Sequence, residues 1–521
     1  MEAARAAHPD PPRPAGEGPT PIARWAKVID NTRCIGCHAC TTACKSENQV
    51  PLSVTRTYVK YVDVGAFPST RRSFQVTRCN QCADAPCVTA CPTAAMFKRA
   101  DGIVDFDKSI CIGCKACIAA CPYDAIFINP DDHSAEKCNF CAHRIDVGLE
   151  PACVVVCPTE AILVGDLEDP ASAVARIVSR DVVNVRRPEK ETRPTLFYKG
   201  AHQATLDPLG ARRPRGGLFM WSEQGRGRDQ VTSGHPGRGT SSAEALLSYD
   251  IPHHMPWDWR VSLYTWTKGI AAGVYLLPLL LVLGGVLAWS SPLWRWGAPI
   301  AAALFLLATA AVLIWDLEHP ERFYMVLTRP QWKSWLVRGG FIITAYGAVL
   351  GLHLLATLLD GTAPQAWLAL AGAPLAVGSA VYTAWLFAQA KGRDLWQNPL
   401  LAPHLLVQAL LLGAAVLIPV ATFAAPAALS ALLLTVTGAG LLHLLLVAAE
   451  ATLPHATAHA ALASREMTRG RYGGWFMAGA ALVAVGMLAP WLGSGFAVAA
   501  LVGVFAHEHA YVQAGQSVPL A

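Results

Sequence analysis

The stretch CIGCKACIAACP, residues 111–122, decides the character of the first part of this chain. Its first three cysteines are separated by two residues each, and a fourth follows after three residues, directly before a proline. Similar groups occur three more times, and all 16 cysteines of the chain fall between Cys34 and Cys157. The four groups are Cys34, Cys37, Cys40 and Cys44; Cys79, Cys82, Cys87 and Cys91; Cys111, Cys114, Cys117 and Cys121; and Cys138, Cys141, Cys153 and Cys157.

These spacings fit iron–sulfur clusters better than disulfides or zinc. Disulfide frameworks are typical of small secreted domains, and the first 30 residues contain no apolar run that resembles a secretory signal. Zinc also binds paired cysteines, but it does not account for triplets followed by Cys-x3-Cys-Pro. Three thiolates on a tight loop can bind three corners of a [4Fe–4S] cluster, while the fourth cysteine reaches a neighbouring cluster. The sequence therefore predicts four [4Fe–4S] clusters, with no ligand to spare and no [3Fe–4S] centre.

The composition changes sharply along the 521 residues. Overall, 53% of the residues are hydrophobic and only 15% are charged, and mean hydropathy is +0.33, which places much of the chain in lipid. The net charge of +5 is small for this length and gives no indication of nucleic-acid binding. We expect a disordered tail at 1–24, a ferredoxin-like α+β iron–sulfur domain at 25–221, a flexible Gly/Ser/Arg-rich linker at 222–256 and an all-α membrane domain at 257–521.

The second half contains apolar runs that are long enough to cross a bilayer, for which about 20 residues are needed. Their nearly uncharged centres favour transmembrane helices over a large soluble bundle or a barrel. We predict eight transmembrane helices at 262–289, 297–316, 339–359, 366–390, 401–423, 427–450, 474–492 and 494–512.

The charges in the loops between these helices predict the orientation. Loops on the side of the iron–sulfur domain contain nine basic residues, and the opposite loops contain Arg295 alone. By the positive-inside rule the iron–sulfur domain should face the cytoplasm, in a multi-pass protein of the inner (cytoplasmic) membrane. The nine residues are Arg322, Arg329, Lys333, Arg338, Lys391, Arg393, Arg465, Arg469 and Arg471.

The cysteine-rich part resembles the four-cluster iron–sulfur subunits of molybdopterin oxidoreductases, such as dimethyl sulfoxide and polysulfide reductases. The resemblance implies that the first group shares clusters with the fourth, and the second with the third. Lys45 departs from this family's pattern, because it stands where a proline is expected. The implied ligand sets are Cys34, Cys37, Cys40 and Cys157; Cys138, Cys141, Cys153 and Cys44; Cys79, Cys82, Cys87 and Cys121; and Cys111, Cys114, Cys117 and Cys91.

Residues 257–521 resemble the quinone-interacting membrane anchors of the polysulfide reductase and nitrite reductase (NrfD-like) family. The similarity rests on the segments WDW at 257–259, KGIAAG at 268–273 and DLEHPERF at 316–323, and on Ser334-Trp335. It implies a site for menaquinone or ubiquinone. Ionisable groups at a membrane edge are candidates for such a site, and those nearest the expected clusters are Lys268, Asp316, Glu318, His319 and Tyr346.

Other histidines give weaker indications. We expect no pair for haem b, because His353, His404, His443, His507 and His509 fall at unmatched depths in the predicted helices. A second polar track suggests either a proton path or a loop end that happens to be rich in histidine. Its members are His443, Glu450, His455 and His459.

The sequence contains no nucleotide-binding loop, nucleophile elbow or flavin fingerprint. It therefore predicts an electron-transfer and membrane-anchor subunit of a respiratory complex rather than an enzyme with its own substrate chemistry. The resemblance implies a molybdopterin-dependent catalytic subunit as the partner, with electrons exchanged with membrane quinone. The alternatives are the electron arm of a membrane hydrogenase, of a quinol-oxidising complex with cytochrome partners, or an inert anchor that serves a soluble acceptor.

Overall fold

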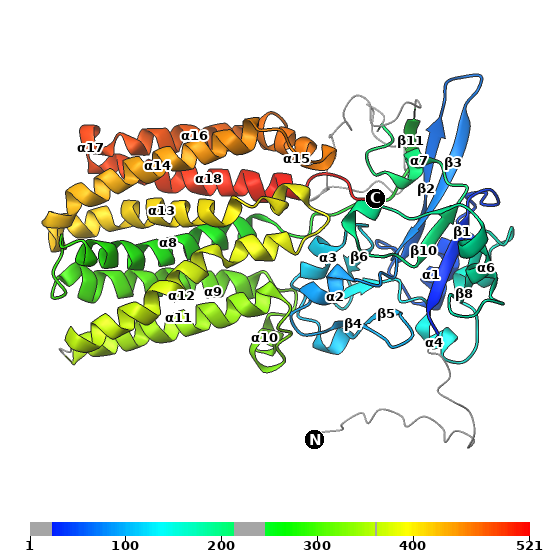
Figure 1. Ribbon diagram of the computed structural model, residues 1–521, viewed down its shortest axis with the longest axis horizontal. Coiled ribbons are helices and arrows are strands. Elements are labelled where there is room, and N and C mark those ends of the chain that lie inside the picture. The colour runs from blue at the N-terminus through cyan, green and yellow to red at the C-terminus, as the bar shows by residue number, and fades with distance from the viewer. Residues whose placement is uncertain (1–22, 213–244, 360–361) are drawn as a thin grey trace, which may run out of the picture.

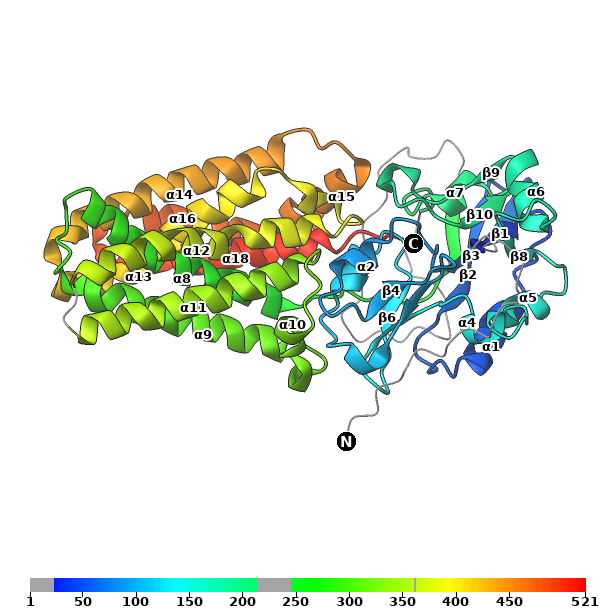
Figure 2. The ribbon, with the colours of Figure 1, turned by 60° about the horizontal axis from the view of Figure 1, so that its bottom comes forward.

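The computed structural model describes residues 23–212, 245–359 and 362–521. Figure 1 shows a bundle of long helices joined end-on to a smaller domain that contains all of the strands. Figure 2, turned by 60°, shows the same division, with α10 and α15 at the end of the bundle beside the smaller domain. The predicted tail at 1–24 lies almost wholly outside the described residues.

The small domain is built from two sheets and two short hairpins. The first sheet has the order β8-β1-β10-β9, and the second has the order β11-β2-β3. The hairpins β4-β5 and β6-β7 follow the second and third cysteine groups. The strands are β1 (Trp25–Asp30), β2 (Thr57–Val64), β3 (Arg71–Arg78), β4 (Met96–Lys98), β5 (Val104–Phe106), β6 (Ile126–Ile128), β7 (Ala135–Lys137), β8 (Ile162–Asp166), β9 (Val183–Asn184), β10 (Leu196–Lys199) and β11 (Ala245–Tyr249).

Short helices follow the cysteine loops and either end before the last cysteine of the group or, in the first group, contain it. In the third group, α3 begins just after Lys115, whose φ of 61° is left-handed, and the helix ends before Cys121-Pro122. The proline cannot donate a backbone hydrogen bond, so the helix ends there and the chain turns. The helices of this domain are α1 (Ala39–Glu47), α2 (Pro86–Ala90), α3 (Ala116–Ala120), α4 (Ala142–Ile145), α5 (Ala152–Val155), α6 (Ala173–Arg180) and α7 (Gln203–Leu206).

The prediction of a flexible linker at 222–256 is wrong for its C-terminal end. Residues 245–249 form strand β11, which pairs antiparallel with β2. The segment that follows is held by His253, whose Nδ1 lies 2.5 Å from Asp124 Oδ2 and whose Nε2 lies 3.2 Å from Asp250 Oδ1. Residues 222–244 of the predicted linker lie outside the described residues.

The helical domain contains seven helices, among the described residues, that are long and apolar enough to cross a membrane. They are Trp259–Leu283 (α8), Leu293–Trp315 (η3 and α9), Trp335–Leu358 (α11), Gln365–Ala388 (within α12, Thr362–Ala388), Leu401–Ala424 (α13), Pro426–Thr452 (η6 and α14) and Ser494–Gly515 (η7 and α18). Shorter helices are α10 (Met325–Thr328) and α15 (Ala458–Thr468).

The predicted seventh span, 474–492, is not one continuous helix. It is divided at Leu488 into α16 (Gly473–Met487) and α17 (Ala489–Leu492). At 1.5 Å per residue, α16 is about 22 Å long, shorter than the ~30 Å apolar core of a bilayer. The first predicted span also ends early, because Gly284 caps α8 and Gly285 adopts a φ of 74°, a conformation that favours glycine.

Helix α8 is the centre of the bundle and is mostly buried. It contacts α13 through glycines: a Cβ atom added at Gly273 would lie 1.8 Å from the carbonyl oxygen of Ala409. Small residues let two helix backbones approach this closely, which favours helix association in a membrane. The polar residues of α8 are therefore enclosed by neighbouring helices rather than exposed to lipid.

Candidate functional site

Two cavities in the small domain are each lined by four cysteines. The first is lined by Cys91, Cys111, Cys114 and Cys117, and backbone amides point at its sulfurs: Ala135 N lies 3.5 Å from Cys111 Sγ and Met96 N lies 3.4 Å from Cys91 Sγ. The second is lined by Cys79, Cys82, Cys87 and Cys121. Both sets match the grouping implied by the resemblance, three cysteines from one group and one from another.

The other eight cysteines lie together in two further sets. Cys44 lies near enough to Cys138, Cys141 and Cys153 to interact with them electrostatically. Asn48 Nδ2 lies 3.6 Å from Cys44 Sγ and 3.8 Å from Cys141 Sγ. Cys157 likewise interacts electrostatically with Cys34 and Cys40. The structure thus brings the sixteen predicted ligands together in four groups of four.

The chemistry of these thiols fits metal binding. None of the sixteen, all of which lie in the described part of the chain, forms a disulfide. Burial raises the pKa of Cys40 to about 11 and the pKa of Cys44 to about 12. A buried thiol of this kind gives up its proton only when a cation takes the proton's place, as iron does in a cluster. The donor set therefore suits iron–sulfur clusters, which supply one-electron transfer when bound.

The loop of the third cysteine group lies directly against the membrane domain. The Lys115 ammonium lies 2.9 Å from Glu318 Oε1 and 3.6 Å from Asp316 Oδ1. The Trp257 indole donates to the Cys114 carbonyl at 3.2 Å. Gly113 has a φ of 68°, and a Cβ atom there would lie 2.4 Å from Glu318 Cβ. Only a glycine allows this approach.

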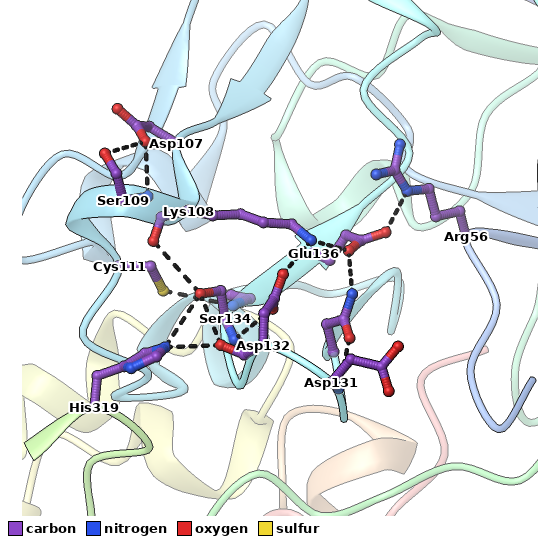
Figure 3. A network of polar contacts seen from close by, with 12 residues as sticks. Arg56, Asp107, Lys108, Ser109, Cys111, Asp131, Asp132, Ser134, Glu136 and His319 are labelled. Carbon is purple, nitrogen blue, oxygen red and sulfur yellow. Dashed lines mark hydrogen bonds and ion pairs between the residues drawn. The ribbon is translucent and has the colours of Figure 1, made fainter. Parts of the chain in front are cut away.

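His319 and Arg322 extend the same contact. The His319 backbone N–H donates to the Ile112 carbonyl at 3.3 Å, and Arg322 Nη1 donates to the Cys111 carbonyl at 2.9 Å. Figure 3 shows the His319 ring between the Asp132 carbonyl, at 2.9 Å, and Ser134 Oγ, at 3.3 Å. The same network continues through Lys108 and Glu136 to Arg56. Three of the five predicted quinone residues thus lie at the interface between the domains.

Asp316 is a buried carboxylate of this interface. It ends α9 and lies 3.6 Å from Arg260 Nε as well as from Lys115. Burial raises the pKa of Asp316 to about 6, although Lys115 and Arg260 act to lower it. Asp316 can therefore exchange a proton near neutral pH.

Lys268 and Tyr346 lie deeper, within the bundle. The Lys268 ammonium is fully buried, donates to the Ala380 carbonyl at 3.0 Å and to Thr383 Oγ1 at 2.5 Å, and lies 4.5 Å from the Tyr382 ring centre. The Tyr346 hydroxyl donates to the Ala271 carbonyl at 2.8 Å. The structure does not place these two side chains with Asp316, Glu318 and His319 in a single contact group.

Glu508 was not among the site residues predicted from the sequence. This glutamate on α18 is buried, contacts Thr265 on α8 through a short hydrogen bond, and interacts electrostatically with Lys268. Its charge in the middle of an apolar run was the available signal, since a carboxylate in a membrane helix needs a partner.

The expectation that the histidines lie at unmatched depths is wrong for three of them. His404 Nε2 lies 2.8 Å from His443 Nδ1, and the His507 ring lies 5.0 Å from that of His443. Glu450 Oε1 joins them, 3.2 Å from His404 Nδ1. His404 and His443 contact each other directly within this cluster.

Only part of the predicted polar track belongs to this cluster. His443 and Glu450 are members, whereas His459 lies near the basic residues Arg187, Lys190 and Arg393 instead. The track is therefore divided between the bundle interior and the side on which the iron–sulfur domain lies.

The fold and the cysteine sets define a membrane protein with an iron–sulfur domain. Residues 249–519, just over half of the chain, match the family described as polysulphide reductase, NrfD, and residues 70–167 match a 4Fe-4S dicluster domain. The chain belongs to the polysulphide reductase NrfD family, with an iron–sulfur domain fused to the membrane anchor.

Curated relatives resemble part of the chain. The chain is 43% identical to a tetrathionate reductase subunit of Salmonella typhimurium, over 39% of this chain and 82% of that protein. It is 41% identical to a polysulfide reductase component of Wolinella succinogenes, over 33% of this chain and 93% of that protein. It is 33% identical to a putative dimethyl sulfoxide reductase iron–sulfur subunit of Halobacterium salinarum, over 45% of this chain and 97% of that protein.

Proposed function

We propose that this protein is the electron-transfer and membrane-anchor subunit of a respiratory oxidoreductase complex. Its sixteen cysteines bind four [4Fe–4S] clusters, which pass electrons between a molybdopterin-dependent catalytic subunit and quinone in the membrane. The observation that carries the proposal is the contact between the Cys111–Cys117 loop and residues 316–322. Electron transfer requires proximity, and this contact holds one cysteine set against the membrane domain.

The proposed quinone site lies between this interface and the interior of the bundle. A quinone that takes two electrons also takes two protons, so its site needs hydrogen-bond donors and proton carriers. Asp316, Glu318 and His319 provide such groups beneath the cysteine loop, while Lys268 and Tyr346 provide buried donors farther in. Menaquinone and ubiquinone both present the two carbonyl oxygens that these groups would bind.

The proposal includes the arrangement in the membrane. The seven long helices, with α16 and α17 together as an eighth crossing, would return the C-terminus to the side on which α8 begins. Contacts of Arg186 with the Leu520 carbonyl and of Lys190 with Asp394 support this arrangement. The excess of basic residues in the loops on that side favours a cytoplasmic iron–sulfur domain in the inner membrane.

The complex purified with its natural partners tests this function. It should contain molybdenum or tungsten as well as iron, and should couple the partner's substrate to a quinone analogue. Nickel or haem c in place of molybdenum would overturn the assignment of the partner. Full activity with a soluble dye but none with any quinone would overturn the assignment of the membrane domain.

A further inference from the structure

Two buried cations converge on a single cysteine. Arg78, at the end of β3, is almost completely buried, and its Nη1 donates to Cys153 Sγ at 3.0 Å. Lys27, on β1, is also buried, and its Nζ lies 3.9 Å from the same sulfur. Asn48 adds an amide donor to Cys44 and Cys141 of the same set, at 3.6 and 3.8 Å. This cysteine set therefore has two positive charges and a neutral donor around it.

Neither cation has a carboxylate partner among the described residues. Arg78 Nε and Nη2 make no hydrogen bond there, and Lys27 otherwise lies over the Phe140 ring, 4.0 Å from its centre. A buried charge without a counter-ion is strongly destabilising. The four thiolates and four sulfides of a cluster together carry more negative charge than its iron balances, and this net anion is what the pair of cations faces.

The other three sets have less positive surroundings. The set with Cys111 faces Lys115, but that charge is paired with Glu318 and Asp316. Near Cys79, the buried Lys137 also donates to the Val104 and Cys138 carbonyls. Cys157 receives the Ala161 backbone N–H at 3.2 Å. Arg78 also lies near Cys40 of that last set, at longer range.

We infer that the cluster held by Cys44, Cys138, Cys141 and Cys153 is the most easily reduced of the four, because Arg78 and Lys27 stabilise the added electron. The inference rests on the proposed function, since it requires four clusters. One-electron reduction adds one negative charge without a proton, and nearby positive charge in a poorly solvated site favours that charge. Electrons that enter the iron–sulfur domain then reside preferentially on this cluster.

Redox titration of the whole protein, followed by electron paramagnetic resonance, tests the inference. Arg78→Gln removes the charge and keeps an amide donor, Lys27→Met removes the second charge, and Arg78→Lys retains a charge. Arg72→Gln is the matched control, because Arg72 lies on the same strand in an exposed ion pair with Asp63. Iron and sulfide content establishes that each variant is fully loaded, and a Cys141→Ser variant assigns the signal.

In Arg78→Gln, the ratio of reduced to oxidised cluster at a fixed potential should fall at least about tenfold, which is ~59 mV for one electron. Lys27→Met should shift the same signal downward, Arg78→Lys should shift it less than Arg78→Gln, and Arg72→Gln should leave it unchanged. Equal shifts in all four signals, or none in fully loaded Arg78→Gln and Lys27→Met, would overturn the inference. If the Arg78→Gln variant does not assemble its clusters, the shift measured in the Lys27→Met variant decides whether the inference holds. Absence of [4Fe–4S] signals from the wild-type protein would refute the proposed function instead.

Discussion

The ammonium nitrogen of Lys115 lies 2.9 Å from a carboxylate oxygen of Glu318. Lys115 directly follows Cys114, and Glu318 packs against Gly113. The pair is largely removed from water, with 8% of the Lys115 side chain and 31% of the Glu318 side chain exposed. This contact fixes the position of the third cysteine loop relative to the membrane domain.

Breaking this pair should disconnect the clusters from quinone. Lys115→Met leaves Glu318 and Asp316 without their shared cation, and a small displacement of the loop can cost up to about 10²-fold in rate. We expect quinone-linked turnover to fall at least about tenfold, with turnover of a soluble dye unchanged. Glu321→Gln is the control, since Glu321 is 63% exposed and forms its ion pairs with His319 and Arg322 rather than with the cysteine loop. Parallel loss of both activities would indicate a folding defect instead.

Substitutions in the proposed quinone site should selectively slow electron exchange with quinone. Removal of a positioned proton donor typically costs about 10²- to 10⁴-fold in rate. We expect Asp316→Asn, His319→Ala and Lys268→Met each to reduce quinone turnover strongly, at wild-type iron content and dye activity. If all three remain within about twofold of wild type, the site lies elsewhere, and the His404–His443–Glu450 cluster is the next candidate.

The cofactor content follows from the four cysteine sets. Anaerobically purified protein should contain about sixteen iron and sixteen acid-labile sulfide per chain. Iron and sulfide assays give the content per chain, and zinc is measured in the same samples. A value near eight, or stoichiometric zinc, would refute four [4Fe–4S] clusters.

The orientation can be measured with reporter fusions. A fusion after Ala521 should report the cytoplasmic side and a fusion within 360–365 the opposite side, so that alkaline phosphatase is active only at the second position. Several of the basic residues behind this prediction also have protein partners: Arg393 donates to the Gln516 and Val518 carbonyls. Phosphatase activity at the C-terminus would therefore show that these charges serve domain docking rather than orientation.

The segment before α8 should weaken at alkaline pH. Burial opposes the charge on His253, but Asp250 and Asp124 more than compensate and raise its pKa to about 9. Because the folded-state pKa exceeds the ordinary value of 6.5, protonation stabilises the fold fully below about pH 6.5, and this contribution is lost as pH rises through 9. The melting temperature in detergent should fall between pH 7 and 10, and less steeply in His253→Gln. Identical pH profiles for the two proteins would contradict this.

The cysteine spacing alone was enough to identify the four cysteine groups. The apolar runs alone were enough to locate most of the membrane helices. Both are local patterns: a tight loop places its own three thiols, and a bilayer requires a length of apolar chain. The same reasoning fails where the pattern is interrupted. Pro490 and Leu488 lie within an apolar run, yet the helix divides there, and the strand β11 is ordered by pairing with β2, almost 200 residues away in sequence.

The residues predicted to bind quinone all lie near the ends of predicted helices. The tertiary structure separates them into two groups. Asp316, Glu318 and His319 share one loop and meet the cysteine domain together, whereas Lys268 meets Glu508 across two helices that are 240 residues apart in sequence. The sequence by itself determined the four cysteine groups and the membrane character, because covalent spacing and hydrophobicity are properties of short segments. Only the tertiary structure decided which charges face each cysteine set and which acid faces Lys268, because the energy of a buried charge depends on partners that folding brings from elsewhere in the chain.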